Sequence, residues 1–437
     1  MTRRALGFVF LAALAVRLGL WLSILPFRNS YYRPDSGEYV ALARNLARHG
    51  AFSTQEREPR LPDASRTPGY PVFLAAHGFF SESPRWPALT QVVMDAVTAA
   101  LSALCAAELF PAAPAWAAGL AYGLEPVAAA HSPLILTETL FTFLLVLALY
   151  ALLRCGREGR LAAALGWGAA LGAAALTRPI GVYLWIPWSA AMWFVWGRRR
   201  PRRLLMCALA AALLPALWCG RNLAVFGRFA YTTMNGVNSL FWEASAITAA
   251  VERTSGDAAL RRVMEGFSAA HPGPFAEPFQ ESGLRVRYSL GIMRAHPLET
   301  LRIHAVSAVK MLIGPGLDLV AEEIFPGETM PRVQAQACPA AGVGTLALLR
   351  QKRGLWPVFL YTMALLIVCY ALAALGLWSV WRGRDVFAAA ACLTPLAYLI
   401  MISAGGWSYY RFRVPLWPFV AVLVPAGLRL LAERRQR

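Results

Sequence analysis

Charged residues are scarce in this sequence. Aspartate, glutamate, lysine and arginine together make up 15% of the 437 residues, whereas about 25% is usual in soluble globular proteins. Hydrophobic residues make up 58%, and they occur in blocks close to the ~20 residues that a helix needs to cross a bilayer. The composition therefore excludes an ordinary soluble domain and predicts a membrane protein that spans the bilayer several times.

Cysteines and catalytic motifs are also few. Six of the seven cysteines lie in or beside apolar blocks and only Cys338 lies well inside a polar region, so we expect free thiols and no disulfide scaffold. No HExxH, CxxC pair, GxSxG or glycine-rich phosphate loop is present, and the six histidines show no ligand spacing. The one candidate cofactor is a divalent metal ion, which Asp35 could hold with help from Glu56, Glu58 and Asp63.

Acidic residues are outnumbered by basic ones, 24 to 42, which gives a net charge of +18. The basic residues cluster between apolar blocks, and no long stretch is left for a nucleic-acid-binding domain, so we expect topology-setting arginines and no nucleic-acid partner. The short arginine-rich loops, which we place in the cytoplasm, are the N-terminus, 154–160, 197–203, 382–385 and 433–437. The alternate loops then face outward, namely 27–86, 220–354 and 404–413.

The pattern predicts an all-α polytopic protein with a transmembrane bundle of about ten spans, surface helices and a small mixed extracytoplasmic domain. Residues 1–219 form a first transmembrane module, 220–354 an extracytoplasmic segment and 355–437 the last spans. The spans are expected at 5–26, 87–110, 113–131, 135–153, 161–176, 180–196, 204–219, 355–381, 386–403 and 414–431.

Shorter helices are expected outside the spans. In RPDSGEYVALARNL (33–46), apolar residues recur with helical spacing, which predicts an amphipathic helix on the membrane surface. A second helix, 71–80, is too short to cross the bilayer, and a third, 297–313, is expected to pack on it. The N-terminal apolar run resembles a signal peptide, but no small-residue cleavage site follows and Arg17 interrupts it. We therefore expect a retained first span.

Asp35 and Glu38 open the first surface helix. One interpretation is a capping box, in which Asp35 accepts hydrogen bonds from backbone N–H groups and Glu38 folds back towards it. The other is a catalytic carboxylate held at the membrane–water interface. The two interpretations are compatible, because a capping carboxylate is rigidly placed and stays ionised.

Several arginines lie at the outward ends of predicted spans, where the positive-inside rule would not place them. So many cations there indicate an anionic partner. The planar fork of arginine suits phosphate, and a phosphate at the level of the headgroups most simply belongs to a lipid. Glu138, near the outward start of a span, indicates a functional carboxylate or, equally, a structural hydrogen bond. The arginines are Arg33, Arg66, Arg178, Arg221, Arg411 and Arg413.

The segments that carry these residues occur in a recognisable order. Together they resemble the GT-C superfamily of integral-membrane glycosyltransferases, in particular the dolichyl-phosphate-mannose–protein mannosyltransferase-like bacterial branch that includes the lipid A aminoarabinose transferase. The resemblance covers most of 1–242 and the last spans. The matching segments are RPDSGEYVALARNL (33–46), SRTPGYPVFLA (65–75), LTETLFTF (136–143), ALTRPIG (175–181), WCGRNLAVFGRF (218–229) with TTMNGVNSLFW (232–242), and YYRFRVPLWPF (409–419).

The resemblance implies a conserved core of about seven spans and two surface helices in the first outward loop. It also implies an aspartate in that loop as the catalytic base, and this aspartate maps to Asp35. Many relatives have adjacent acidic residues there, whereas here Ser36 and Gly37 follow Asp35. The resemblance therefore leaves the role of Glu38 and any dependence on metal open.

The function that we predict is an inverting glycosyltransferase in the bacterial inner membrane, with its active site on the extracytoplasmic face. Nucleotide sugars are cytoplasmic, so the donor would be a sugar linked to a polyprenyl phosphate and the acceptor a glycan, lipid or protein. Asp35, with Glu38, would accept the acceptor's proton. Arg66, Arg178, Arg221, Arg411 and Arg413 would bind the donor phosphate, and Glu138, Tyr70 and Tyr39 would position the sugar or the acceptor.

Three other classes remain open at this point. A polysaccharide polymerase or ligase is the nearest. A lipid-linked-glycan transporter should show charges deep in several spans and pseudo-symmetric halves, whereas the polar residues here gather at one face. A non-catalytic assembly protein remains possible if Asp35 serves only as a helix cap.

Overall fold

The structure, a computed structural model, describes residues 1–436 except 79–82, 197–199, 276, 325–341 and 407. Within this part of the chain every regular element is helical, which confirms the all-α prediction. Among the described residues, seven helical stretches are long and apolar enough to cross a membrane, and the chain is a multi-pass membrane protein. These stretches are α1 (Arg3–Ile24), α4 (Arg85–Leu109), α7 (Glu138–Glu158), α10 (Pro201–Phe226), Pro297–Ile324, Arg353–Arg382 and α19 (Val386–Ser403).

The expected count of ten spans is not confirmed. The predicted span at 113–131 consists of two short helices, α5 (Trp116–Gly123) and α6 (Pro126–His131). The chain breaks here because Pro126 has no N–H with which to continue α5. Glu125 instead caps α6, since its Oε2 accepts a hydrogen bond from the backbone N of Ala128 at 2.6 Å.

Two other expected elements also differ. The predicted span at 180–196 contains a 3₁₀ turn, η2 (Pro179–Gly181), and the 12-residue helix α9 (Trp185–Trp196), which is short for a span. The helix expected to pack on the bilayer is α15 (Pro297–Ile313), and with α16 (Leu317–Ile324) it forms an apolar stretch long enough to cross one.

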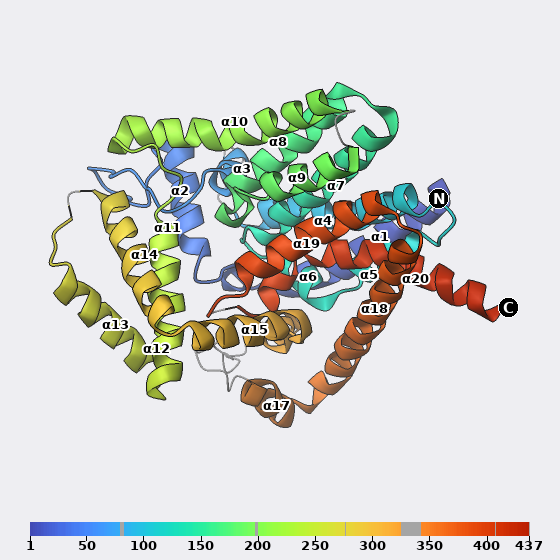
Figure 1. Ribbon diagram of the computed structural model, residues 1–437. Helices are drawn as coiled ribbons and strands as arrows, with labels where there is room; N and C mark the ends of the chain where they lie inside the picture. Colours follow the sequence, from blue (N-terminus) through green and yellow to red (C-terminus); the bar gives the residue numbers. More distant parts are fainter. Residues whose placement is uncertain (79–82, 197–199, 276, 325–341, 407, 437) are drawn as a thin grey trace.

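In the segment expected to be a mixed domain, every regular element among the described residues is helical. After α10 come α11 (Met234–Val237), a π-helical stretch η4 (Asn238–Ala244), α12 (Ser245–Glu252), α13 (Gly256–Ala270) and α14 (Pro278–Ala295). Figure 1 shows these helices at one end of the molecule and both chain termini at the other. The other elements of the last third are α17 (Gly342–Gln351), η5 (Arg353–Leu355), α18 (Trp356–Arg382), η6 (Tyr410–Arg413) and α20 (Trp417–Arg435).

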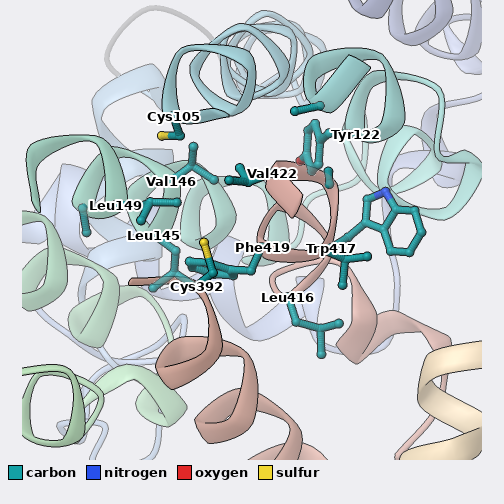
Figure 2. Packing of buried hydrophobic residues seen from close by; sticks show 14 of the residues in the cluster. Cys105, Tyr122, Leu145, Val146, Leu149, Cys392, Leu416, Trp417, Phe419 and Val422 are labelled. Atoms are coloured by element: carbon teal, nitrogen blue, oxygen red, sulfur yellow. The ribbon is translucent and has the colours of Figure 1, made fainter. Parts of the chain in front are cut away.

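The first half of α20 forms the centre of the bundle. Residues 417–427 are all buried, and α20 packs against α4, α5, α18 and α19. Figure 2 shows Trp417, Phe419 and Val422 of this helix among buried side chains of its neighbours. The indole Nε1 of Trp417 also donates to the carbonyl oxygen of Ala121 at 2.9 Å. Because α20 is fixed in the core, the short η6 turn just before it is held at the end of the bundle.

Both predicted surface helices are present. The first is α2 (Ser36–His49), which ends at Gly50 in the left-handed conformation (φ 64°) that favours glycine. The second is α3 (Gly69–Gly78), a ten-residue helix that packs against α2, α4 and α8 (Leu161–Thr177). A 3₁₀ turn, η1 (Arg28–Tyr31), leads from α1 towards α2. The loop between α1 and α4 therefore places α2 against the bundle.

Candidate functional site

Asp35 stands at the N-terminus of α2, but it does not cap the helix. Its backbone is already in the right-handed helical region (φ −72°, ψ −23°), and its side chain accepts no capping hydrogen bond. The nearby Ser36 hydroxyl accepts a hydrogen bond from the backbone N of Arg33 at 2.9 Å and donates to the carbonyl oxygen of Ile135 at 2.7 Å. The capping-box interpretation of Asp35 and Glu38 is therefore wrong.

The carboxylate of Asp35 bridges two arginines that are far away in the sequence. Nη2 of Arg66 donates to its Oδ1 at 3.2 Å, and Nη1 of Arg411 donates to its Oδ2 at 3.0 Å. Burial favours the neutral acid, but Arg411 and Arg66 outweigh it, so the pKa of Asp35 lies below its ordinary value. Because its side chain is still 34% exposed, Asp35 is an ionised carboxylate that a substrate can reach.

Glu138 begins α7 and lies on the far side of Arg411 from Asp35. Its Oε1 accepts hydrogen bonds from Nε of Arg411 and from Nη1 of Arg178, and its side chain is fully buried. Arg178, at the end of α8, also donates to the hydroxyl of Thr137 at 3.2 Å. The other oxygen of Glu138, Oε2, is buried without a hydrogen-bond partner among the described residues. Glu138 therefore keeps one acceptor atom unused.

Arg66 completes the other side of the cluster. Its Nε donates to Oε2 of Glu38 at 2.6 Å, and its Nη1 donates to the hydroxyl of Tyr39 at 3.2 Å. Its guanidinium also lies over the Tyr39 ring, 4.9 Å from the centroid. Burial lowers the pKa of Arg66, yet Tyr39, Glu38 and Asp35 outweigh that effect and raise it above its ordinary value. Arg66 is therefore a fixed cation.

These residues form one chain of alternating charge. It runs from Glu38 through Arg66, Asp35, Arg411 and Glu138 to Arg178. Three guanidinium groups balance three carboxylates, so the described cluster is neutral. Alternating forks of this kind can bind a phosphate when it displaces a carboxylate from an arginine.

Some of the predicted phosphate-binding arginines are not brought to this cluster. Arg413 is fully buried, and its Nη2 donates to Oε1 of Glu125 at 2.8 Å while Nη1 donates to backbone carbonyls including that of Gly314 at 2.6 Å. Arg221 donates to the carbonyl oxygen of Asp63 at 2.9 Å. Arg33, which was grouped with these arginines but not assigned to the donor phosphate, forms an ion pair with Glu322 of α16 at 3.0 Å.

The remaining predicted residues have separate places. The Tyr39 hydroxyl accepts from Arg66, as described above. Tyr70 is buried, meets the Tyr39 ring edge-on at 5.2 Å between centroids, and donates its hydroxyl proton to Gln91 at 2.7 Å. Tyr70 therefore packs against the Tyr39 ring from the buried side. Cys338, predicted to be a free thiol, lies outside the described residues, and the other six cysteines are free.

The acidic residues of the loop after α2 are engaged locally. Glu56 pairs with Arg44, and Glu58 pairs with Arg60. Asp63 accepts hydrogen bonds from backbone N–H groups of its own loop. In the part of the chain that the structure describes, no group of three or more His, Cys, Asp or Glu side chains is arranged to hold a metal ion. The suggested help of these residues to a metal at Asp35 has no geometric support.

Two contributors to the site carried no clear signal in the sequence. The centroids of the Phe141 and Phe412 rings lie 5.9 and 5.8 Å from the guanidinium of Arg178, so two aromatic rings contact that group. Phe412 stands between two arginines in YYRFR, and this alternation was the only available hint. Nothing in the sequence indicated that Phe141, one turn into a span, would meet an arginine at the end of α8.

Comparisons with known proteins agree with this architecture. A sequence model of the family described as dolichyl-phosphate-mannose-protein mannosyltransferase matches residues 68–219, less than half of the chain. No curated protein sequence matches the chain. The matched region contains α3 to α9 and most of α10, and it includes Glu138 and Arg178 of the cluster.

Solved structures resemble the whole chain. The oligosaccharyltransferase AglB of Archaeoglobus fulgidus, in complex with an inhibitory peptide and a dolichol-phosphate, matches 98% of this chain and 50% of its own, with a TM-score of 0.55 and 15% identity. The complex of the same organism's oligosaccharyltransferase with Zn and sulfate matches 98% of this chain and 49% of its own, with a TM-score of 0.53 and 15% identity. ArnT of Cupriavidus metallidurans, bound to undecaprenyl phosphate, matches 98% of this chain and 79% of its own, with 16% identity and a TM-score of 0.43, which is too low to carry an argument.

At these identities the likeness establishes a shared fold. The chain spans about half the length of the archaeal oligosaccharyltransferases that it matches. The family match over residues 68–219 and the shared fold agree with the resemblance to the GT-C superfamily that the sequence predicted.

Proposed function

We propose that the protein is an inverting glycosyltransferase that moves a sugar from a polyprenyl-phosphate donor to an acceptor hydroxyl or amine at the membrane surface. The observation that carries this proposal is the bridge that Asp35 forms between Arg66 and Arg411. A carboxylate and two guanidinium groups at one point supply a proton acceptor and a phosphate clamp, which are the groups that such a transfer needs.

The donor phosphate would bind where Asp35 now occupies the two arginines. Arg66 and Arg411 each have a second carboxylate partner, Glu38 and Glu138 respectively. The arginines therefore stay oriented when Asp35 leaves them, and their free N–H groups turn to the phosphate oxygens. As the bond between the sugar C1 and the phosphate oxygen breaks, negative charge grows on the phosphate, and the fixed cations stabilise it.

Release from the arginines would make Asp35 a better base. In the free site its pKa is depressed because Arg411 and Arg66 hold the carboxylate. When a phosphate takes over both arginines, burial remains and the attraction is weakened, so the pKa of Asp35 rises. Donor binding would thus prepare Asp35 to accept the proton as the acceptor attacks C1 from the face opposite the phosphate. Attack from that face inverts the anomeric centre.

Glu138 would orient a substrate hydroxyl. Arg178 and Arg411 fix its Oε1, while Oε2 is buried without a partner among the described residues. A buried acceptor atom left without a hydrogen bond is costly, and a sugar hydroxyl would satisfy it. We therefore assign the sugar to the Glu138 side of Arg411 and the acceptor to the open side of Asp35.

The direct test is turnover of defined donors. Purified protein in detergent or nanodiscs is incubated with a panel of polyprenyl-phosphate sugars and extracts containing candidate acceptors, and released polyprenyl phosphate is detected. We expect release with at least one donor, and inversion at C1 of the product. Release of polyprenyl diphosphate from a diphosphate-linked glycan would instead favour a polymerase or ligase, and movement of an intact donor between leaflets would favour a transporter.

Sidedness is a separate part of the proposal. The arginine-rich loops predict that the cluster faces away from the cytoplasm, in bacteria into the periplasm. Alkaline phosphatase fused after residue 300 should be active and the same enzyme fused after residue 200 inactive. The reverse pattern would place the cluster in the cytoplasm and would contradict a donor carried across the membrane.

A further inference from the structure

The motif WCGRNLAVFGRF, with the threonines that follow it, has no role in the chemistry proposed above. It contacts the loop 51–66, which connects α2 to α3 and carries Arg66 at its end. At its start this loop is tied to α2, because Nδ2 of Asn45 donates to the carbonyl oxygens of Ser53 and Gln55 at 2.7 and 2.9 Å. The loop is also held by a hydrogen bond from the end of α10.

Arg221, near the C-terminus of α10, supplies that hydrogen bond. Its Nη1 donates to the carbonyl oxygen of Asp63 at 2.9 Å. Its guanidinium lies 4.8 Å from the centroid of the Trp218 ring and 5.5 Å from that of Phe52, which itself belongs to the loop. A guanidinium held between aromatic rings loses little freedom when it forms the hydrogen bond. Arg221 therefore fixes Asp63 relative to α10.

Asp63 in turn holds the backbone of Arg66. Oδ1 of Asp63 accepts hydrogen bonds from the backbone N of Ser65 at 3.0 Å and of Arg66 at 2.8 Å. The residues between are also held by the segment after α10, because the hydroxyl of Thr232 donates to the carbonyl oxygen of Ser65. The backbone N of Thr233 donates to the carbonyl oxygen of Ala64 at 3.0 Å.

We propose that Arg221 and Thr232 are positioning residues that aim the guanidinium of Arg66 at the donor phosphate. This inference rests on the proposed function. Arg221 does not touch the phosphate itself, since its contacts are to the loop, to the side chain of Asn222 and to aromatic rings. Its action passes through Asp63 and the backbone to Arg66. A misplacement of about 1 Å can cost up to a hundredfold in rate, so the tie matters even though it lies behind the site.

The first experiment measures donor use by Arg221→Gln and Thr232→Val. Each change removes one hydrogen bond to the loop and leaves the Arg66 side chain itself unaltered. We expect kcat/KM for the lipid donor to fall roughly tenfold in Arg221→Gln and severalfold in Thr232→Val. Arg221→Lys should recover little, because an ammonium lacks the planar fork. The matched control is Arg228→Gln in the same motif, whose side chain is 64% exposed and pairs with Glu277 at the surface. It should leave kcat/KM unchanged.

The second experiment separates positioning from a general structural role. In an Arg66→Gln background, Arg221→Gln should reduce kcat/KM by less than about twofold further, because its effect is transmitted by the residue already removed. A role in overall stability would instead produce the full loss in both backgrounds. Hydrogen exchange of the amides at 63–66 should also accelerate in Arg221→Gln while the helices keep their protection.

The outcomes distinguish this inference from the proposed function. If the wild-type protein releases no polyprenyl phosphate, or Arg66→Gln is as active as wild type, the proposed function fails. If Arg66→Gln is impaired while Arg221→Gln and Thr232→Val match the wild type, the proposed function stands and the positioning role is overturned. Additive losses in the double variant also overturn it.

Discussion

Two groups of arginine–carboxylate pairs among the described residues differ in their surroundings. Arg17 donates to Asp95 at 2.5 Å inside the bundle, and Arg413 donates to Glu125 at 2.8 Å, with all four side chains 0–2% exposed. The cluster around Asp35 is built from the same chemical groups, but Asp35 and Glu38 are 34% and 51% exposed. The same type of ion pair is therefore inaccessible in the core in one group and accessible to solvent in the other.

The two groups differ in the number of carboxylates that each arginine contacts as much as in their exposure to solvent. Arg413 is surrounded by Glu125 and the backbone carbonyls of the α15 terminus, none of which can leave. Arg66 and Arg411 each divide their N–H groups between two carboxylates. An arginine with two partners can give one of them up to an incoming phosphate and remain paired. Breaking the two kinds of pair should thus have opposite effects on stability and on turnover.

The largest expected effect is that of Asp35→Asn. Asparagine cannot accept the proton, so turnover should fall 10²- to 10⁴-fold, about the range for removal of a general base. Stability should change by no more than roughly 1 kcal/mol, because Arg66 and Arg411 keep Glu38 and Glu138 as partners. Turnover and thermal unfolding are measured on the same preparation. Well-folded protein with near wild-type turnover would remove Asp35 from the mechanism.

Glu125→Gln should do the reverse. The neutral amide leaves the buried guanidinium of Arg413 without its counter-ion, which costs on the order of 3–5 kcal/mol. We expect a lower unfolding temperature and less folded protein in the membrane, with normal turnover per folded molecule. Thermal unfolding in detergent and activity normalised to folded protein provide the measurement. A stable variant with no activity would show that the buried pair belongs to the site after all.

Arg66→Gln should have an intermediate effect that is confined to the donor. A charge-assisted hydrogen bond to phosphate contributes about 1.5–3 kcal/mol, so use of the donor should fall roughly ten- to hundredfold. The matched control is Arg44→Gln, because Arg44 forms a surface pair with Glu56 and does not contact the cluster. Steady-state kinetics with varied donor check both. Equal kinetics in the two variants would mean that Arg66 does not bind the donor phosphate, which would contradict the proposed function.

The smallest effect should appear in the dependence of rate on pH. The pKa of Asp35 in the free site lies below its ordinary value because Arg411 and Arg66 hold the carboxylate, so the carboxylate stays ionised until the pH falls through that depressed pKa. The profile of kcat/KM reports the free enzyme, and that of kcat reports the complex. If the donor phosphate releases Asp35 from its arginines, the acidic limb of kcat should lie at higher pH than that of kcat/KM. Coincident limbs would mean that Asp35 keeps its arginines during turnover.

Much of the fold could be read from the chain. The apolar blocks gave α1, α4, α7, α10, α18 and α19, because backbone polar groups in lipid must be hydrogen-bonded within the segment, which makes a long apolar run helical. The two surface helices were also predicted. The break at Glu125 was not, because a single proline in an apolar block is often tolerated in a membrane helix. Whether the helix ends there depends on the hydrogen-bond and ion-pair partners of Glu125 in the folded protein.

The site divides in the same way. The sequence by itself determined which residue types lie at one end of the bundle, since spans that alternate across the membrane bring every second loop together. It could not show that Asp35 bridges two arginines and does not cap α2. It also could not show that Arg66, Arg178 and Arg411 join one cluster, from which Arg413 and Arg221 are absent. Asp35 and Arg411 are 376 positions apart. Only the packing of α2, α7, α8 and η6 brings such distant side chains within hydrogen-bonding distance, because partner choice depends on the three-dimensional direction of each side chain.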